Sequence, residues 1–240
     1  PKPSSAASDV YKRQVIADTT KTDSLRVKAL QGSLGAFAYS ASLPSAKENV
    51  TEVSNGVLTL KIANKGGYIT EATINGFEQF SKDSKKQVAL IQQNNANLNL
   101  QIHTQDNRIL NTKDLYFEPT VTKEGANDVV TMRLKAGANQ FLEYRYVLKP
   151  KEYMMDFAIR SQGLSSVVNT AKPLDMEWQL KSFRNEKSVS YENRYTDLVY
   201  EYENGKDNSL SATSKLDEKS AEAVTYVAVS YTHLTLPTKA

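Results

Sequence analysis

A glycine pair between two alternating apolar segments limits what this chain can fold into. The stretch Val57–Ile74 reads VLTLKIANKGGYITEATI. Before the pair, apolar and polar side chains alternate with the period of a strand that is buried on one side only. Gly66-Gly67 then lets the chain reverse through backbone angles that other residues avoid. The stretch therefore predicts a hairpin that opens an antiparallel sheet.

Strand-like segments recur along the rest of the chain, with turn-forming residues between them. Pro119 places one of these segments at a sheet edge or a bulge, because proline cannot donate to a ladder. Short strands at such intervals predict an all-β fold, an antiparallel β-sandwich or barrel. We expect a loop over 203–220. The expected later strands are residues 87–92, 98–103, 116–122, 130–134, 141–148, 153–159, 174–180, 195–202 and 224–229.

Composition excludes several classes of site. The chain has no cysteine, which rules out disulfides, thiolate zinc sites and cysteine nucleophiles. The formal net charge is +3, and residues 1–14 and 229–240 together supply all of that excess. A neutral body does not favour phosphate binding driven by counterion release, so we expect no nucleic-acid partner. No apolar run is long enough to cross a bilayer.

The two ends differ from the body. Residues 1–14 and 229–240 resemble translated sequencing-adaptor segments, so we treat them as non-native tails. Residues 15–50 predict a linker with some helical tendency, and a docked helix is the alternative. The economical interpretation of 51–228 is a single β-sandwich domain.

Few residues are candidates for chemistry. His103 is the only histidine of the body, on the polar side of an expected strand, and we interpret it as a surface residue. His233 lies in a tail and is set aside. Asp175 and Glu177 share one face of a strand, so an acid–base pair is geometrically possible. Their alternation with Leu174, Met176, Trp178 and Leu180 favours a solvated face opposite a core instead.

Aromatic side chains on two expected strands offer surfaces for stacking on sugars or bases, but their alternation favours the core or a sheet face. They are Tyr144, Tyr146, Tyr153 and Phe157. Gly66-Gly67 follows a strand without opening a helix, so it is not a phosphate-binding loop. We therefore predict no catalytic, cofactor-binding or metal-binding residue, no cofactor and no enzymatic activity.

Two blocks resemble a known family. VSNGVLTLKIANKGGYITEATI (53–74) and NQFLEYRYVLKPKEYMMDFAIRSQG (139–163) are similar to the large periplasmic domain of the YidC membrane protein insertase family (YidC/Oxa/Alb), of a Bacteroidetes type. ENRYTDLVYEYENGK (192–206) is compatible with it. The resemblance implies a β-sandwich of galactose-mutarotase-like topology, here incomplete at its C-terminus, on the periplasmic side of the inner membrane.

The resemblance also implies partners and neighbouring segments. It implies a transmembrane helix before residue 15 and an insertase core after the sandwich, which would connect this chain to the membrane. The implied partners are nascent membrane proteins and the Sec translocon, with a chaperone-like role in membrane insertion and folding. Two alternatives stay open: a carbohydrate-binding or carbohydrate-modifying sandwich, and a secreted adhesion sandwich.

Overall fold

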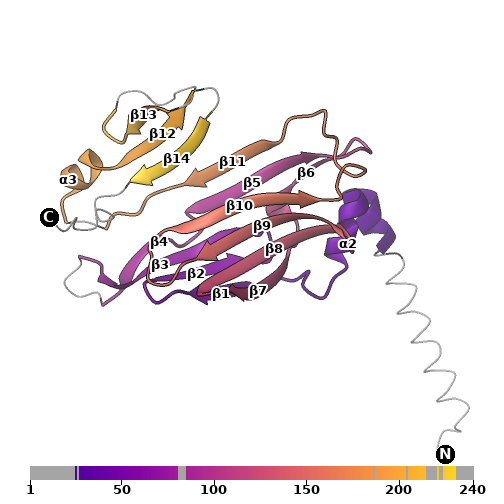
Figure 1. The fold of residues 1–240 in the computed structure, drawn as a ribbon, viewed down its shortest axis with the longest axis horizontal. Helices are drawn as coiled ribbons and strands as arrows, with labels where there is room; N and C mark the ends of the chain where they lie inside the picture. Colours follow the sequence, from indigo (N-terminus) through magenta and orange to yellow (C-terminus); the bar gives the residue numbers. More distant parts are fainter. Residues whose placement is uncertain are drawn as a thin grey trace, which may run out of the picture. The chain divides into compact units, whose positions relative to one another are not determined.

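Antiparallel strands make up most of the molecule (Figure 1). The computed structural model describes residues 25, 27–80, 85–185, 187–203, 205–214, 221 and 224–230, with the backbone alone for 225–230. The sequence favours one domain over 51–228, whereas the chain divides into two compact units. The first comprises residues 1–75 and 89–181, and the second comprises residues 76–88 and 182–240.

The first unit is a sandwich of antiparallel sheets, which confirms the predicted fold class. The sheet orders are β1-β2-β3-β4, β10-β9-β8-β7 and β11-β5-β6, where the end of β3 (76–78) and the start of β4 (87–88) are assigned to the second unit. Pro119 lies on the edge strand β7, as expected. The strands are β1 (Val50–Ser54), β2 (Leu58–Ala63), β3 (Ile69–Glu78), β4 (Gln87–Ile91), β5 (Ala96–His103), β6 (Ile109–Asn111), β7 (Glu118–Glu124), β8 (Asn127–Gly137), β9 (Gln140–Leu148), β10 (Met155–Gln162) and β11 (Asp175–Leu180).

The second unit contains a three-stranded sheet of order β13-β12-β14 and one short helix. Its elements are α3 (Val189–Arg194), β12 (Asp197–Tyr202), β13 (Lys206–Ser211) and β14 (Val224–Ser230). The loop expected over 203–220 was wrong in part, because β13 lies within it. A tight reversal makes this strand possible, with Glu203 at φ 45° and Gly205 at φ 104°. Tyr202 then pairs with Lys206.

The predicted hairpin is confirmed, and its glycines are required by their surroundings. β2 pairs with β3 from Leu58 opposite Ile74 onward. Gly66 and Gly67 have φ of 84° and 68°, a region that strongly favours glycine. A Cβ on Gly67 would lie 2.9 Å from the Phe117 ring. The Gly66 amide donates to the Leu115 carbonyl over 2.8 Å. The turn therefore docks closely on residues 115–117.

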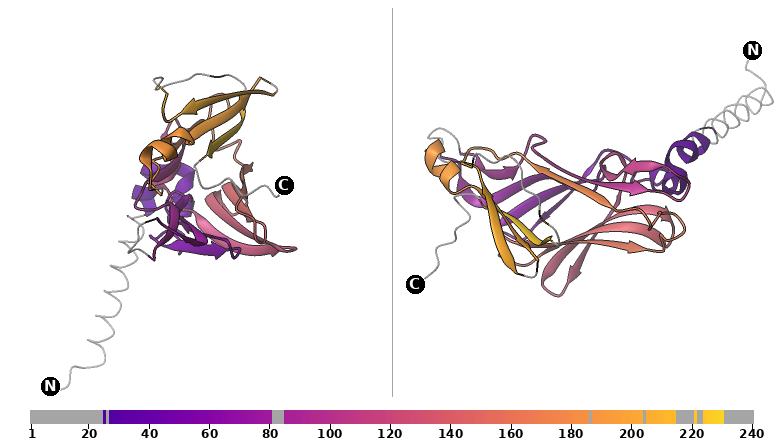
Figure 2. Two further views of the ribbon diagram at one scale, coloured as in Figure 1. Left: turned by 90° about the vertical axis from the view of Figure 1, so that its left-hand side faces the viewer. Right: turned by 90° about the horizontal axis from the view of Figure 1, so that it is seen from above.

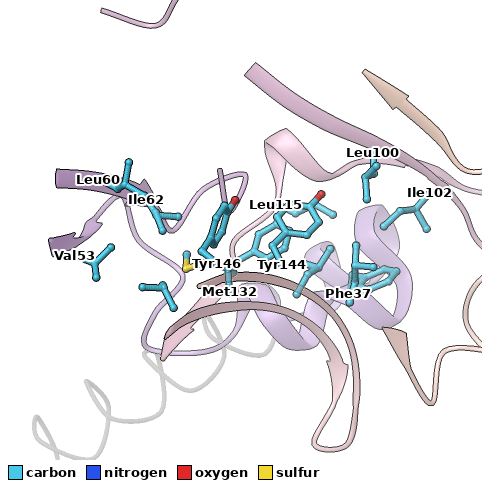
Figure 3. Packing of buried hydrophobic residues seen from close by; sticks show 14 of the residues in the cluster. Phe37, Val53, Leu60, Ile62, Leu100, Ile102, Leu115, Met132, Tyr144 and Tyr146 are labelled. Carbon is cyan, nitrogen blue, oxygen red and sulfur yellow. The ribbon is translucent and has the colours of Figure 1, made fainter. Parts of the chain in front are cut away.

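Two buried tyrosines make hydrogen bonds inside the core, and one of them bonds to this turn (Figure 3). The Tyr146 hydroxyl donates to the Gly67 carbonyl over 2.7 Å, and the Tyr144 hydroxyl donates to Thr112 Oγ1 over 3.0 Å. The same Thr112 oxygen accepts from the Leu100 amide over 2.8 Å. Both rings belong to one cluster with residues from β1, β2, β5 and β8. The interpretation of Tyr144 and Tyr146 as core residues is thus confirmed.

A helical segment docks on the first unit. Residues 27–34 are helical, followed by η1 (Gly35–Phe37) and α2 (Ala38–Ala41), which lie at one end of the strands (Figure 2). Phe37 is buried in the core cluster, and Ser40 Oγ donates to the Tyr116 carbonyl over 2.6 Å. Part of the segment expected to be a linker is therefore packed. Within the described ranges, no helix combines the length and the apolar character that a bilayer crossing requires.

The close contact at Gly67 predicts a large destabilisation by a single methyl group. Gly125 has a similar φ of 62° but open space around its Cβ position. Gly125→Ala should therefore cost only the left-handed backbone penalty, about 1–2 kcal/mol. Gly67→Ala should cost roughly 1–3 kcal/mol more because of overpacking against Phe117. Urea unfolding of both variants measures this difference, and equal losses would contradict the close docking of the turn.

Burial of Tyr144 predicts a loss of stability at alkaline pH. Burial raises the pKa of Tyr144 to about 12, although the hydrogen bond with Thr112 opposes the shift. The pKa of Tyr144 is higher in the folded state than in the unfolded state. The contribution of the neutral Tyr144 side chain to the free energy of unfolding is therefore complete below about pH 10 and is lost as pH rises towards 12. It amounts to roughly 3 kcal/mol. Unfolding titrations across this range should show a shallower alkaline decline for Tyr144→Phe; an unchanged decline would be inconsistent with the burial.

Candidate functional site

A polar groove of about 930 Å³ lies beside the glycine turn in the first unit. The docking of Gly66 positions it, because a Cβ there would lie 3.3 Å from the Cα of Lys113, and Lys65 pairs with Tyr116 in an isolated β-bridge. These contacts bring the β2–β3 turn next to the 112–117 segment. The lining residues are Glu48, Asn49, Val50, Ala63, Lys65, Tyr68, Asn94, Ala96, Asn97, Lys113, Asp114 and Gln179.

The groove carries hydrogen-bonding groups and balanced charge. The lining contains two ammonium groups, Lys65 and Lys113, and two carboxylates, Glu48 and Asp114. Four carboxamides, the Tyr68 ring and three small or apolar side chains make up the rest. Side chains of this kind donate to and accept from hydroxyl groups, and an aromatic ring offers an apolar face. The groove is thus chemically suited to a neutral polar ligand.

One carboxamide of the lining is incompletely satisfied. Asn97 Oδ1 is buried and has no hydrogen-bond partner among the described residues. Asn97 lies opposite Gln179 in the pairing of β5 with β11, and Gln179 donates to Glu177 over 2.6 Å. A buried acceptor without a partner costs stability, so this position favours a water or a ligand group.

A second polar cluster fixes the loop after β5. The Thr104 hydroxyl donates to Asp106, and this bond, with help from the Arg108 guanidinium, holds the pKa of the Asp106 carboxyl below its usual range. Arg108 also donates to the Gly32 carbonyl over 3.0 Å. The cluster therefore connects the loop to the N-terminal helical residues, and each of its charges has a structural partner.

His103 ends β5 with its side chain half-buried, and its carbonyl accepts from the Asn169 amide over 2.8 Å. No group of three histidine, cysteine or carboxylate residues within the described ranges could hold a metal ion. His233 lies outside the described residues. The expectations of no catalytic, cofactor or metal residue stay predictions.

Asp175 and Glu177 lie on β11, both exposed, as a solvated face requires. The prediction that the apolar side chains on the other face are buried in a core was wrong. Met176 and Trp178 are 59% and 52% exposed, and Leu174 is 51% exposed. The alternation shows which side chains share a face of the strand. Whether those side chains are buried depends on another layer of the fold, whose residues lie far away in the sequence. Phe157 contacts the rings of both buried tyrosines, yet it remains 38% exposed.

Sequence reasoning missed the groove. Its residues come from five separate segments, and none of them forms a local motif. The one available signal was the glycine pair, since adjacent glycines indicate a close approach of backbone. The glycine pair predicts that another segment docks at the turn, but it does not predict which residues line the groove, such as Lys113, Asn97 and Gln179.

Comparisons with known proteins agree with the two sequence blocks. The family model of the YidC periplasmic domain matches residues 50–231. A membrane protein insertase YidC of Porphyromonas gingivalis is 32% identical over 201 residues, which cover 83% of this chain and 31% of that protein. The proteins of the same name from Parabacteroides distasonis and Bacteroides fragilis are each 34% identical, over 75% of this chain and 27% and 28% of their own lengths.

This chain therefore spans about a third of the length of these relatives. The match includes the glycine turn, both core tyrosines and β11, and it extends through β14. The resemblance to a Bacteroidetes-type sequence is confirmed. By the extent of this match, the chain belongs to the YidC periplasmic domain family.

Proposed function

We propose that this chain is a non-catalytic, chaperone-like module of a membrane protein insertase on the periplasmic side of the inner membrane. The family match over 50–231 carries the proposal. The matched relatives are named membrane protein insertases. The module would assist the insertion and folding of inner-membrane proteins, with nascent membrane proteins and the Sec translocon as partners.

The surface of the first unit supports an interaction role. Besides the polar groove, it exposes Met176 and Trp178, two large apolar side chains that are neighbours on one face of β11. Large exposed apolar side chains that lie close together mark interaction surfaces more often than isolated ones do. A binding module needs such a surface, whereas a hydrolase or transferase would need clustered acid–base groups.

The test is a chimera. Residues 50–231 replace the matching region of the Porphyromonas gingivalis relative, and insertion of a newly made membrane protein into proteoliposomes is followed by protease protection. We expect the chimera to keep the yield of the unmodified relative within about twofold, because the two modules match one family model and are 32% identical.

The matched control is the same chimera with Gly67→Val, in which the side chain meets Phe117. Its insertion yield should fall, since the module no longer folds stably. Equal yields from the two chimeras would contradict an assisting role. Cross-linking from the folded chimera to the client or to translocon subunits then identifies which partner the module contacts.

Carbohydrate binding is the second candidate, and the groove beside the glycine turn favours it. Tyr144 is buried and cannot stack on a sugar, so Tyr68 is the aromatic residue to examine. If the groove binds a glycan, Tyr68→Ala should weaken binding at least about fivefold through loss of the ring contact. Tyr195→Ala, an exposed tyrosine outside the groove, is the control. Absence of binding across a glycan array would remove this candidate.

A further inference from the structure

Asn55 joins two turns that lie far apart in the sequence. Its side-chain nitrogen donates to the Lys149 carbonyl over 2.7 Å and to the Glu152 carbonyl over 2.6 Å. Its side-chain oxygen accepts from the Val57 and Leu58 amides over 3.2 and 2.9 Å. The carboxamide thus uses both of its donor hydrogens and both lone pairs of its oxygen. All of these groups belong to the first unit, so the contact is complete within that unit.

The turn that Asn55 holds has a strained backbone. Lys151, between β9 and β10, has a φ of 59°, a region that residues with side chains rarely adopt. The Lys151 amide donates to the backbone carbonyl of Asn55 over 3.2 Å. A strained conformation persists when the surrounding contacts hold it. The Asn55 side chain supplies two of the three hydrogen bonds that do so here, and loss of its carboxamide would therefore loosen the turn.

The residue after Asn55 makes this carboxamide chemically labile. Gly56 has no Cβ to hinder its backbone nitrogen, which can attack the Asn55 Cγ. A bond then forms from the Gly56 nitrogen to Cγ, and the bond from Cγ to Nδ2 breaks. Nδ2 leaves as ammonia, which carries the proton lost from the Gly56 amide. Water opens the resulting succinimide ring at either of its carbonyls, which leaves aspartate or isoaspartate at position 55.

The leaving nitrogen is the atom that donates to both carbonyls of the other turn. Reaction in the folded chain must break both of these hydrogen bonds, so we expect the fold to slow the reaction. The product has acceptor oxygens where Asn55 has a donor, and it cannot bond to the carbonyls of Lys149 and Glu152. Its carboxylate places negative charge beside two carbonyl oxygens instead. Deamidation and the contact between the two turns therefore exclude each other.

Two further Asn-Gly pairs begin at Asn75 and Asn204. The Asn75 side-chain nitrogen donates to Thr59 Oγ1 over 3.0 Å and to the Gly56 carbonyl over 3.2 Å. These partners lie on the paired strand and its adjoining turn, so conversion of Asn75 would free no distant segment. Asn204 lies outside the described residues. Asn55 is thus the described Asn-Gly position whose conversion reaches a distant segment.

We propose that Asn55 is a deamidation site, and that its conversion releases the turn of residues 149–152 from the turn of residues 54–57. The modification needs only water and the neighbouring backbone nitrogen. It rests on contacts within the first unit and is independent of the function proposed above. While the two turns stay in contact the carboxamide is protected, and once they separate its loss prevents them from making the same contact again.

The rate of conversion is the first test. Peptide mass mapping of the full chain in mildly alkaline buffer follows deamidation at Asn55 in the folded chain and in urea. We expect conversion to be at least about tenfold slower in the folded chain, because two hydrogen bonds must break first. Gly56→Ala in urea is the control, since its methyl group hinders the attack and should slow conversion. Equal rates in the folded and unfolded chains, or a Gly56→Ala chain that converts as fast as the unmodified one, would overturn the proposal.

Release of the turn is the second test. Hydrogen exchange of the Lys151 amide, which donates to Asn55, reports the contact directly. Asn55→Asp should speed this exchange about tenfold, because it removes the two side-chain bonds that hold the turn. Asn139→Asp makes the same chemical change at an exposed position between β8 and β9, and it should leave the exchange of Lys151 unchanged.

The deamidated fraction of the unmodified chain, isolated by ion exchange, gives the same comparison without a substitution. Its Lys151 amide should also exchange about tenfold faster than in the intact fraction. Exchange at Lys151 that is unchanged in this fraction would show that the turn stays in place without the carboxamide, and the proposal would fail.

Discussion

The docking of the Gly66-Gly67 turn against Leu115 and Phe117 is the contact on which much of the first unit depends. The Gly66 amide donates to the Leu115 carbonyl, and the Gly67 carbonyl accepts from the Tyr146 hydroxyl. Through these bonds a local turn is fixed by residues from a distant strand and by the connection between β6 and β7. Neither glycine has space for a Cβ atom, so the close packing at this turn requires the residue type that the sequence has there.

The same docking gives the unit both its core and its groove. On the inner side, Tyr144, Thr112 and Leu100 form a buried hydrogen-bonded chain that fixes β9 against β5 and η2 (Thr112–Asp114). On the outer side, Lys65, Tyr68 and Lys113 gather around the groove. Buried hydroxyls that are fully paired make one arrangement of strands more favourable than its alternatives. The geometry of the polar surface thus follows from the geometry of the core.

Sequence alone predicted the strands well and their burial less well. Alternation places Leu58, Leu60 and Ile62 on a buried face because a neighbouring layer covers them. The same alternation on β11 leaves Met176 and Trp178 exposed, because coverage depends on segments that a single strand's pattern does not describe. In the 35–41 segment the sequence shows only weak helical propensity, yet the segment is helical. Burial of Phe37 stabilises the helix there. The family could be recognised from two local blocks, whereas the groove needed five segments in space.

The contacts of the N-terminal helical segment determine how a force on the chain reaches the first unit. Ser40 is bonded to the Tyr116 carbonyl, and Tyr116 bridges to Lys65, next to the glycine turn. Phe37 is inserted in the core only three residues earlier along the chain. A pull on the chain upstream of residue 32 would therefore load the bond from Arg108 to the Gly32 carbonyl first, and then Phe37 and the bond from Ser40 to Tyr116. The segment thus transmits tension to the residues on which the glycine turn docks.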